Sequence, residues 1–152
     1  DVKGVHLDIK NKEELLGAFE QMGTAPCILQ KMVPPGHEMI IGGRFDNEFG
    51  PVVVCGLGGV YVEIMADRSI RVAPVDKENA RGMIEGLKCS AILKGARGRK
   101  PADIPALEDV IVRVSRLLIE NPRVTNLDIN PVIVNDEGKG CIIVDAKVEI
   151  TC

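Results

Sequence analysis

The chain has 152 residues, of which 45% are hydrophobic and 27% charged, as expected for one soluble globular domain with a single core. With 3% aromatic residues and a net charge of −3, it offers little for base stacking or for general attraction to nucleic acid or acidic membranes. The five cysteines are widely spaced, and neither a signal peptide nor an apolar run of roughly 20 residues occurs. These features favour a reduced, cytoplasmic protein without membrane or nucleic-acid partners.

The first segments alternate between strand and helix patterns. Val2–Ile9 has the alternation of a short strand. Asn11 is a suitable N-cap for a helix over Lys12–Met22, and Gly23 ends that helix. Ala25–Met32 then predicts a further strand.

A rigid Pro-Pro-Gly turn separates this segment from a strand over Glu38–Arg44. The next strand, around Val52–Cys55, leads into the glycine-rich stretch Gly56–Gly59. Glycines after a strand can bring backbone N–H groups close to a phosphate, or let two chains approach closely. An ordinary glycine turn between strands remains the alternative.

The middle of the chain predicts a hairpin from Tyr61–Met65 and Ser69–Ala73, followed by a helix over Lys77–Leu87 with Asp76 as its N-cap. A stretch free of acidic residues follows, and it carries Lys88, Lys94, Arg97, Arg99 and Lys100. This basic stretch could contact phosphate or form a solvated face.

The longest helix pattern begins at Asp103 and stops at Asn121-Pro122. A hairpin follows within Asn126–Val148, around the polar turn Asn135–Gly138. If the pairing is symmetric about that turn, partner numbers sum to 275, so Asn130 faces Asp145 and Asp128 faces Lys147.

The two faces of this hairpin differ in character. One face carries Asn130, Asp145, Asp128 and Lys147, so an amide oxygen and a carboxylate could converge on one hard cation. A surface pair without metal is the alternative. The other face is apolar and is expected to cover a core; it consists of Ile129, Ile133, Ile142, Val144 and Ala146.

The order of these elements is not the regular alternation of a parallel doubly wound sheet. It predicts an α+β fold, in which a mostly antiparallel sheet has helices packed on one face.

Four motifs in this order resemble one family: QKMVPPGHEMIIG at 30–42, FGPVVVCGLGGVYVE at 49–63, GARG at 95–98, and LDINPV with VDAK at 127–132 and 144–147. The chain is similar to the ATP-grasp module of the NDP-forming acyl-CoA synthetases. It resembles the β subunit of ADP-forming acetyl-CoA synthetase most, and the succinyl-CoA synthetase β subunit more distantly. The resemblance implies a single domain over residues 1–152, the C-terminal lobe of an ATP-grasp fold.

The resemblance also implies a ligase reaction. Acyl-CoA, ADP and phosphate give a carboxylic acid, CoA and ATP through a phosphohistidine carried by a CoA-binding partner subunit or domain. The implied cofactors are Mg²⁺ and ATP or ADP, with Asn130 and Asp145 as the magnesium ligands. Mg²⁺ usually takes one or two protein oxygens and completes its octahedron with water and phosphate oxygens.

The nucleotide contacts follow from the same resemblance. Gln30, Lys31 and Met32 match the segment that lies along the base, and Glu38 matches the acid that accepts hydrogen bonds from the ribose. Arg97, in the GARG loop, is a candidate phosphate contact by its charge. The alternatives are a solvated strand position for Glu38 and a core position for Met32.

The chain departs from the family pattern in two ways. It begins at the Asp of the D-x-G-G-V segment, so the first lobe of the nucleotide clamp is missing, and Lys3 stands where relatives have Gly. We therefore expect the chain to be inactive alone and to work in an oligomeric assembly. Two other functions stay open: a regulatory module fused to a protein acetyltransferase, and a non-catalytic assembly domain.

Overall fold

The computed structural model describes residues 4–23, 26–59, 67–95 and 100–151. Contacts within the chain divide it into two compact units, residues 1–34 and residues 35–152, and each is described by itself. No helix among the described residues is long and apolar enough to cross a membrane.

The first unit contains helix α1 (Lys12–Met22), as predicted. The Asn11 side chain caps it by accepting a hydrogen bond from the Glu14 backbone N–H at 2.9 Å. The strands predicted at Val2–Ile9 and Ala25–Met32 were wrong, because the described residues 4–10 and 26–34 form no strand. Alternation alone does not make a strand, since its backbone groups also need a neighbouring strand to bond to.

The described part of the second unit forms a six-stranded antiparallel sheet in the order β3-β2-β1-β4-β5, with β6 also paired to β4. The strands are β1 (His37–Asp46), β2 (Gly50–Leu57), β3 (Arg68–Val72), β4 (Val124–Val134), β5 (Cys141–Ile143) and β6 (Ala146–Ile150). The predicted partner of β3, Tyr61–Met65, lies outside the described residues.

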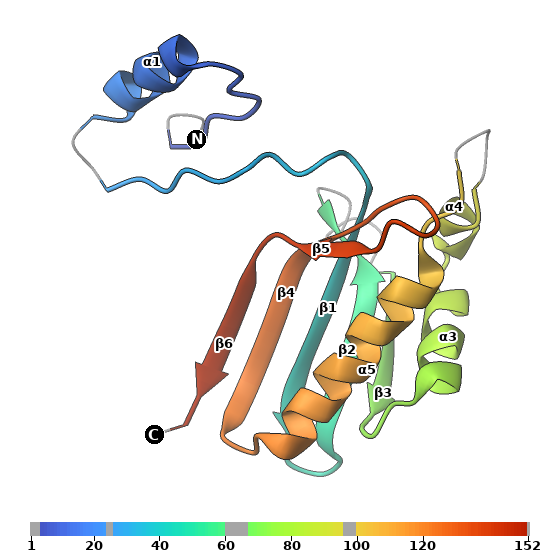
Figure 1. Cartoon of the computed structure of the whole chain (residues 1–152). Coiled ribbons are helices and arrows are strands. Elements are labelled where there is room, and N and C mark those ends of the chain that lie inside the picture. The colour runs from blue at the N-terminus through green and yellow to red at the C-terminus, as the bar shows by residue number, and fades with distance from the viewer. Residues whose placement is uncertain (1–3, 24–25, 60–66, 96–99, 152) are drawn as a thin grey trace. The chain divides into compact units, whose positions relative to one another are not determined.

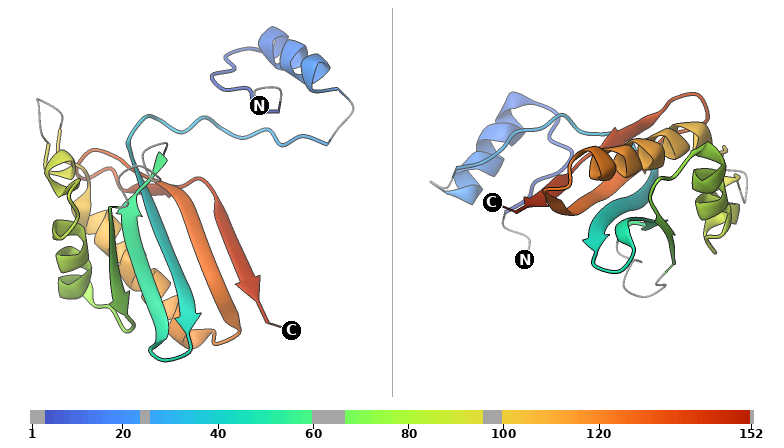
Figure 2. Two further views of the ribbon diagram at one scale, coloured as in Figure 1. Left: turned by 180° about the vertical axis from the view of Figure 1, so that it is seen from behind. Right: turned by 90° about the horizontal axis from the view of Figure 1, so that it is seen from below.

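Three described helices accompany this sheet: α3 (Lys77–Glu85), α4 (Ser90–Leu93) and α5 (Ile104–Glu120). Figure 1 and the end-on view in Figure 2 place α3 and α5 on the same face of the sheet. The predicted N-cap Asp76 is confirmed, because it accepts a hydrogen bond from Asn79 N–H. Asp103, where the longest helix was predicted to begin, caps α5 by accepting a hydrogen bond from Ala106 N–H. The predicted α+β fold with helices on one face is therefore confirmed.

The core lies between α5 and the sheet. Met39 and Ile41 of β1 and Val53 and Cys55 of β2 are fully buried, and they meet the apolar stripe that α5 presents at spacings of three and four residues. No described helix of this unit lies on the opposite face of the sheet, as the view from behind in Figure 2 shows. We call it the open face.

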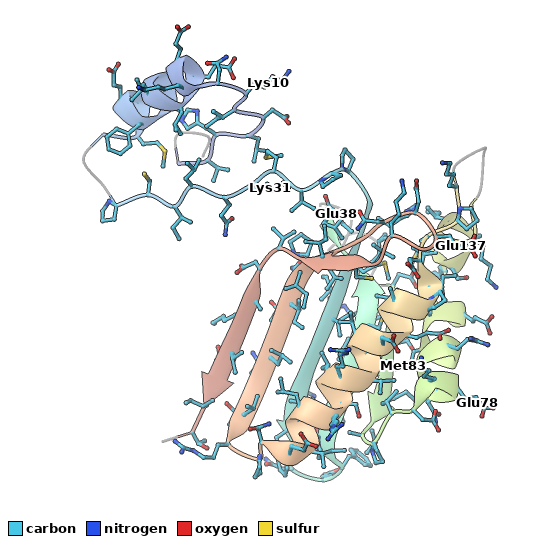
Figure 3. All side chains as sticks on the ribbon, in the orientation of Figure 1. Lys10, Lys31, Glu38, Glu78, Met83 and Glu137 are labelled. Carbon is cyan, nitrogen blue, oxygen red and sulfur yellow. The ribbon has the colours of Figure 1, made fainter. Side chains whose placement is uncertain are left out.

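Helix α3 closes the side of this core. Met83 is fully buried, whereas Glu78 is exposed and points away from the sheet (Figure 3). Arg81 joins α3 to α5 through an ion pair of 2.8 Å with Glu108, whose side chain is only 3% exposed. Because a buried carboxylate is costly without a partner, this pair fixes how the two helices pack.

Candidate functional site

Strand β4 forms a hairpin with β5 and β6. This hairpin bends where the two predicted metal ligands, Asn130 and Asp145, face each other. Its predicted register is confirmed, since Val134 pairs with Cys141, Asp128 with Lys147 and Ile129 with Ala146. Between β5 and β6 the ladder continues through the Asn130 N–H, which donates to the Asp145 carbonyl at 3.2 Å. Asp145 therefore stands at the break between the two short strands, opposite Asn130.

A bulge in β4 lies at the same point. Met39 of β1 pairs with Val132, but Ile41 pairs with Ile129, so β4 carries one extra residue there. An extra residue moves the following side chains to the other face of the sheet. Accordingly, Leu127 and Ile129 face the core before the bulge, and Val132 and Val134 face it afterwards.

Because of this bulge, the five residues predicted to form one buried apolar face are not all buried. Ile129 and Ile133 are buried, at 5% and 8% exposure, but Ile142 and Val144 are each 37% exposed and Ala146 is also exposed. The prediction that all five cover a core was wrong, because it assumed an unbroken alternation along β4.

A groove of about 350 Å³ runs along the open face beside this bend. Its floor includes Gly42 and Gly56, where the lack of side chains leaves room above the sheet. Its polar lining comes from three strands, β1, β3 and β4, and from the residue before β3: Arg44, Asp67, Arg68, Asn126, Asp128 and Asn130. Both charge signs are present, as a site for an anion with its counter-cation requires.

Charged residues of β6 border the same face. Lys147 lies directly opposite Asp128, and its ammonium group contacts Glu149 at 2.7 Å. The hydrogen bond with Glu149 is the main reason that the pKa of Lys147 lies above its ordinary value, and Asp128 adds to this. The same bond lowers the pKa of Glu149. Asp128 therefore lies beside a cation that offsets its charge.

Glu38 lies at the other end of β1, against the glycine stretch that follows β2. Its carbonyl accepts a hydrogen bond from Gly58 N–H at 2.8 Å. A Cβ on Gly58 would stand 2.9 Å from the Glu38 carbonyl carbon. A Cβ on Gly59, whose φ is +73°, would overlap the Glu38 carboxylate. Two glycines are thus needed for this loop to reach Glu38, which lies at the same end of the sheet as Glu137 (Figure 3).

The remaining predicted contacts lie outside the described part of the second unit. Gln30, Lys31 and Met32 belong to the first unit, in an extended segment where Met32 is 45% exposed, so the core alternative for Met32 is wrong. Arg97 lies outside the described residues.

Asp103 is a structural residue whose full role the sequence did not reveal. Besides capping α5, its Oδ2 accepts a hydrogen bond from Gly140 N–H at 2.7 Å, and its N–H donates to the Asn135 carbonyl at 2.8 Å. It therefore fastens the end of the basic stretch to the turn of the β4–β5 hairpin.

We expect Asp103→Ala to lower the free energy of unfolding by about 2 kcal/mol, because a helix cap and a link to the hairpin are lost together. Urea unfolding at pH 7 measures this change. Asp109→Ala on the exposed side of α5 is the matched control and should change stability little, since its ion pair with Lys77 is largely exposed. Equal effects of the two substitutions would contradict the linking role of Asp103.

Asp67 ties the start of β3 to the segment after α3. Only 6% exposed, its carboxylate accepts hydrogen bonds from the backbone N–H groups of Lys88 at 2.8 Å and Cys89 at 2.7 Å. Burial by itself raises its pKa, but these two donors outweigh it and hold the pKa of Asp67 below 3.8.

The neighbouring thiols are not activated. Burial, the main cause, raises the pKa of Cys55 to about 12, and burial with the Asp67 contact raises that of Cys89 to about 12. Both stay protonated at neutral pH and are unsuited to act as nucleophiles.

The lowered pKa of Asp67 predicts an acid-dependent contribution to stability. The contribution is fully present above the unfolded value of 3.8 and is lost as the pH falls through the lower folded value. We expect Asp67→Asn to destabilise the protein at pH 7, with the difference shrinking below about pH 4. Urea midpoints across this pH range test it, with the exposed Glu78→Gln as control. A difference independent of pH would contradict this role.

Asn130 and Asp145 fit magnesium by their chemistry. Their positions face each other at the bend, and one neutral amide oxygen and one carboxylate are the kind and number of ligands that Mg²⁺ takes from proteins. No cluster of three or more His, Cys, Asp and Glu side chains suited to a metal occurs in the described part of the chain.

Sequence comparison identifies the family. A family model described as an ATP-grasp domain matches residues 1–150. The β subunit of acetate–CoA ligase (ADP-forming) I from Pyrococcus furiosus is 43% identical over 158 residues, covering 97% of this chain and 67% of that subunit. The 4-hydroxybutyrate–CoA ligase (ADP-forming) of Nitrosopumilus maritimus is 36% identical, covering 97% of this chain but only 23% of that protein.

Solved structures agree with this assignment. Acetyl-coenzyme A synthetase 1 of Ca. Korarchaeum cryptofilum, in complex with coenzyme A and Mg-AMPPCP, superposes with a TM-score of 0.87 at 38% identity over 97% of this chain and 68% of that one. The apo form of the same enzyme has a TM-score of 0.76 at 43% identity, covering 80% of this chain and 57% of that one. The chain belongs to the ATP-grasp family, and its relatives include ADP-forming acetate–CoA ligases.

Proposed function

We propose that this chain is the C-terminal ATP-grasp lobe, a single functional domain, of an ADP-forming acyl-CoA synthetase. The full enzyme converts acyl-CoA, ADP and phosphate into a carboxylic acid, CoA and ATP through a phosphohistidine. The observation that carries the proposal is the pairing of Asn130 with Asp145 at the bend of a hairpin in a chain matched over residues 1–150 by the ATP-grasp family.

In this proposal the open face of the sheet receives the Mg-nucleotide. Asn130 and Asp145 each supply one oxygen to Mg²⁺, which when bound neutralises phosphate charge during transfer. Arg44 and Arg68 line the same groove and add positive charge for a polyanion. Asp128 stays close to Lys147, so its carboxylate repels the phosphates less.

The nucleoside is assigned to the other end of β1. Glu38 accepts hydrogen bonds from the ribose hydroxyls, as one carboxylate can accept two. Gly58 and Gly59 let the following loop lie against Glu38. Gln30, Lys31 and Met32 would lie along the base, and Arg97 would contact phosphate.

The full-length assembly would include a further subunit or domain. A CoA-binding subunit or domain carries the phosphohistidine, and nucleic acid and membranes are not partners. The described cysteines are free thiols, which supports a cytoplasmic location. The chain alone would bind nucleotide weakly and would not catalyse turnover, because both lobes of the ATP-grasp fold are needed to position the phosphoryl group.

A reconstitution experiment tests this function. The chain, joined to the first ATP-grasp lobe and mixed with the CoA-binding partner of a relative, should form ATP from acetyl-CoA, ADP and phosphate in a Mg²⁺-dependent reaction. The chain alone, assayed in parallel, should form none. Absence of ATP formation by an assembly that is folded and binds CoA would overturn the proposal.

A further inference from the structure

We propose that Arg44 binds the phosphoryl group while it passes between the histidine of the CoA-binding partner and ADP. This inference rests on the proposed function, and it assigns one residue of the open face to the transfer step itself. It is supported by the position of Arg44 relative to Glu38 and Asn130, by the space over Gly42, and by the weak pairing of the Arg44 side chain in the structure.

Arg44 lies beyond the proposed metal position when the open face is followed from the proposed ribose position. Side chains alternate along a strand, so Glu38 and Arg44 of β1 lie on one face, roughly 20 Å apart. The bulge in β4 places Asn130 opposite Ile40, which lies between them. A nucleotide whose ribose binds Glu38 and whose magnesium binds Asn130 therefore directs its last phosphate towards Arg44.

The phosphoryl donor enters from the Arg44 end of the groove. Transfer to ADP forms a bond between phosphorus and an oxygen of the β-phosphate, while the bond between phosphorus and the histidine nitrogen breaks. The electron pair stays on that nitrogen, which takes up a proton. Because the attacking oxygen and the leaving nitrogen lie roughly in line through phosphorus, the histidine approaches from the side opposite the nucleotide. That side is the end of the groove where Arg44 pairs with Asn126.

The groove has space for a phosphoryl group between Asn130 and Arg44. Gly42 lies between them on β1, and a Cβ there would stand 3.0 Å from the Leu127 carbonyl oxygen. Gly42, Arg44 and Asn130 all line the groove of about 350 Å³. Arg44 follows Gly42 on the same face, about 7 Å further along the strand. A phosphoryl group bound to Mg²⁺ at Asn130 can therefore lie over Gly42, within reach of the long Arg44 side chain.

The guanidinium group of Arg44 has no strong partner in the structure. Its side chain is 68% exposed, and its ion pair with Asp46 is long, at 3.7 Å. The Asp46 carboxylate already accepts the backbone N–H groups of Glu48 at 3.0 Å and Phe49 at 3.1 Å. These two bonds are the main reason that the pKa of Asp46 is lowered, and the charge of Arg44 contributes least. An exposed pair of this kind contributes little to stability, so Arg44 can turn to a phosphoryl group at little cost.

Two other described cations near the groove are less suited to this role. The ammonium group of Lys147 is held by Glu149 at 2.7 Å. Arg68 of β3 pairs with Gly56, which pairs in turn with Ile40, so Arg68 lies level with the metal position rather than beyond it. A planar guanidinium group also binds two phosphoryl oxygens at once, which suits Arg44 to a group whose charge is spread over three oxygens.

A single-turnover reaction of the reconstituted assembly tests the proposal. The histidine of the partner is first phosphorylated with acetyl-CoA and inorganic phosphate, and Mg²⁺ is then added with a series of ADP concentrations. Arg44→Gln should lower the rate of ATP formation at saturating ADP by about 100-fold, because a positioned donor to the transferred group is lost. The ADP concentration that gives half of the maximal rate should not change. Arg44→Lys should recover part of the rate, since it restores the charge but not the planar group.

Arg113→Gln is the matched control, because it removes the same charge from an exposed position of α5, on the other face of the sheet. It should transfer at the wild-type rate. Equilibrium dialysis should give Arg44→Gln the wild-type Kd for Mg-ADP, with circular dichroism reporting its fold. Transfer by Arg44→Gln at the wild-type rate would overturn the proposal, and so would a loss that more ADP restores, because Arg44 would then bind the nucleotide. Failure of the wild type to form ATP would instead overturn the proposed function, and this inference with it.

Discussion

Asp145→Asn is expected to lower the rate of Mg²⁺-dependent ATP formation in the reconstituted enzyme by about 100-fold, because it removes the only charged oxygen of the proposed Asn130–Asp145 ligand pair. Asn130→Ala should act in the same direction. Raising the Mg²⁺ concentration should recover part of the activity of Asp145→Asn, which a purely structural defect would not allow. Steady-state kinetics across a Mg²⁺ series measure both effects.

Asp136→Asn is the matched control for this prediction. Asp136 lies in the turn of the same hairpin, where its carboxylate is 3.5 Å from the ammonium group of Lys139 and 45% of its side chain is exposed. It should keep nearly the wild-type rate. An Asp145→Asn enzyme as active as Asp136→Asn would show that this carboxylate does not act on the nucleotide.

Gly58→Val is expected to lower the free energy of unfolding by about 3 kcal/mol, because its Cβ would stand 2.9 Å from the Glu38 carbonyl carbon and 3.0 Å from the Met39 nitrogen. Both are backbone atoms of β1, which cannot move without disturbing the pairing of β1 with β2 and β4. Chemical denaturation of the chain measures the loss.

Gly82→Ala supplies the control, since nothing lies within 4 Å of a Cβ built on this exposed residue of α3. It should leave stability unchanged or raise it by up to about 1 kcal/mol, because alanine favours a helix more than glycine does. If Gly58→Val were as stable as Gly82→Ala, the close contact between the glycine stretch and Glu38 would be disproved.

The sequence was sufficient to predict which residues of the hairpin pair, but not which side of the sheet each of them lies on. The polar turn between two apolar runs determined which residues pair, and Asn130 does lie opposite Asp145. The bulge beside Asn130 could not be read from the sequence, because Ile129, Val132, Ile133 and Val134 are all apolar and any alternation fits them. A bulge depends on the neighbouring strand β1, which comes from a distant part of the chain.

The residues of the candidate site that were not predicted from the sequence were missed for one common reason. Asp67 bonds to Cys89, 22 residues later, and Asp103 bonds to Gly140, 37 residues later. The apolar spacing of α5, which is a local pattern, predicted that the helix begins at Asp103, but no local pattern reports a contact over such distances. Arg44 and Arg68 were missed for the same reason, since only the sheet order places β1 and β3 on either side of β2.

The false strands at the start of the chain have a different cause. Segments 2–9 and 25–32 carry β-type residues, but the described part of the first unit gives them no strand to pair with. Helix α1, whose cap and hydrogen bonds are all local, was predicted correctly from the same region. Local interactions were predictable here, and pairing with other parts of the chain was not.

The most direct test of the nucleotide site replaces Mg²⁺ by Mn²⁺, which prefers the same oxygen ligands and broadens nearby NMR signals. With ADP and Mn²⁺ together, the amide signals around Asn130 and Asp145 should broaden first, and those of α3, on the other face of the sheet, should stay sharp. Broadening centred on α3, or none around Asn130 and Asp145 at saturating nucleotide, would contradict the assignment of the open face as the Mg-nucleotide site.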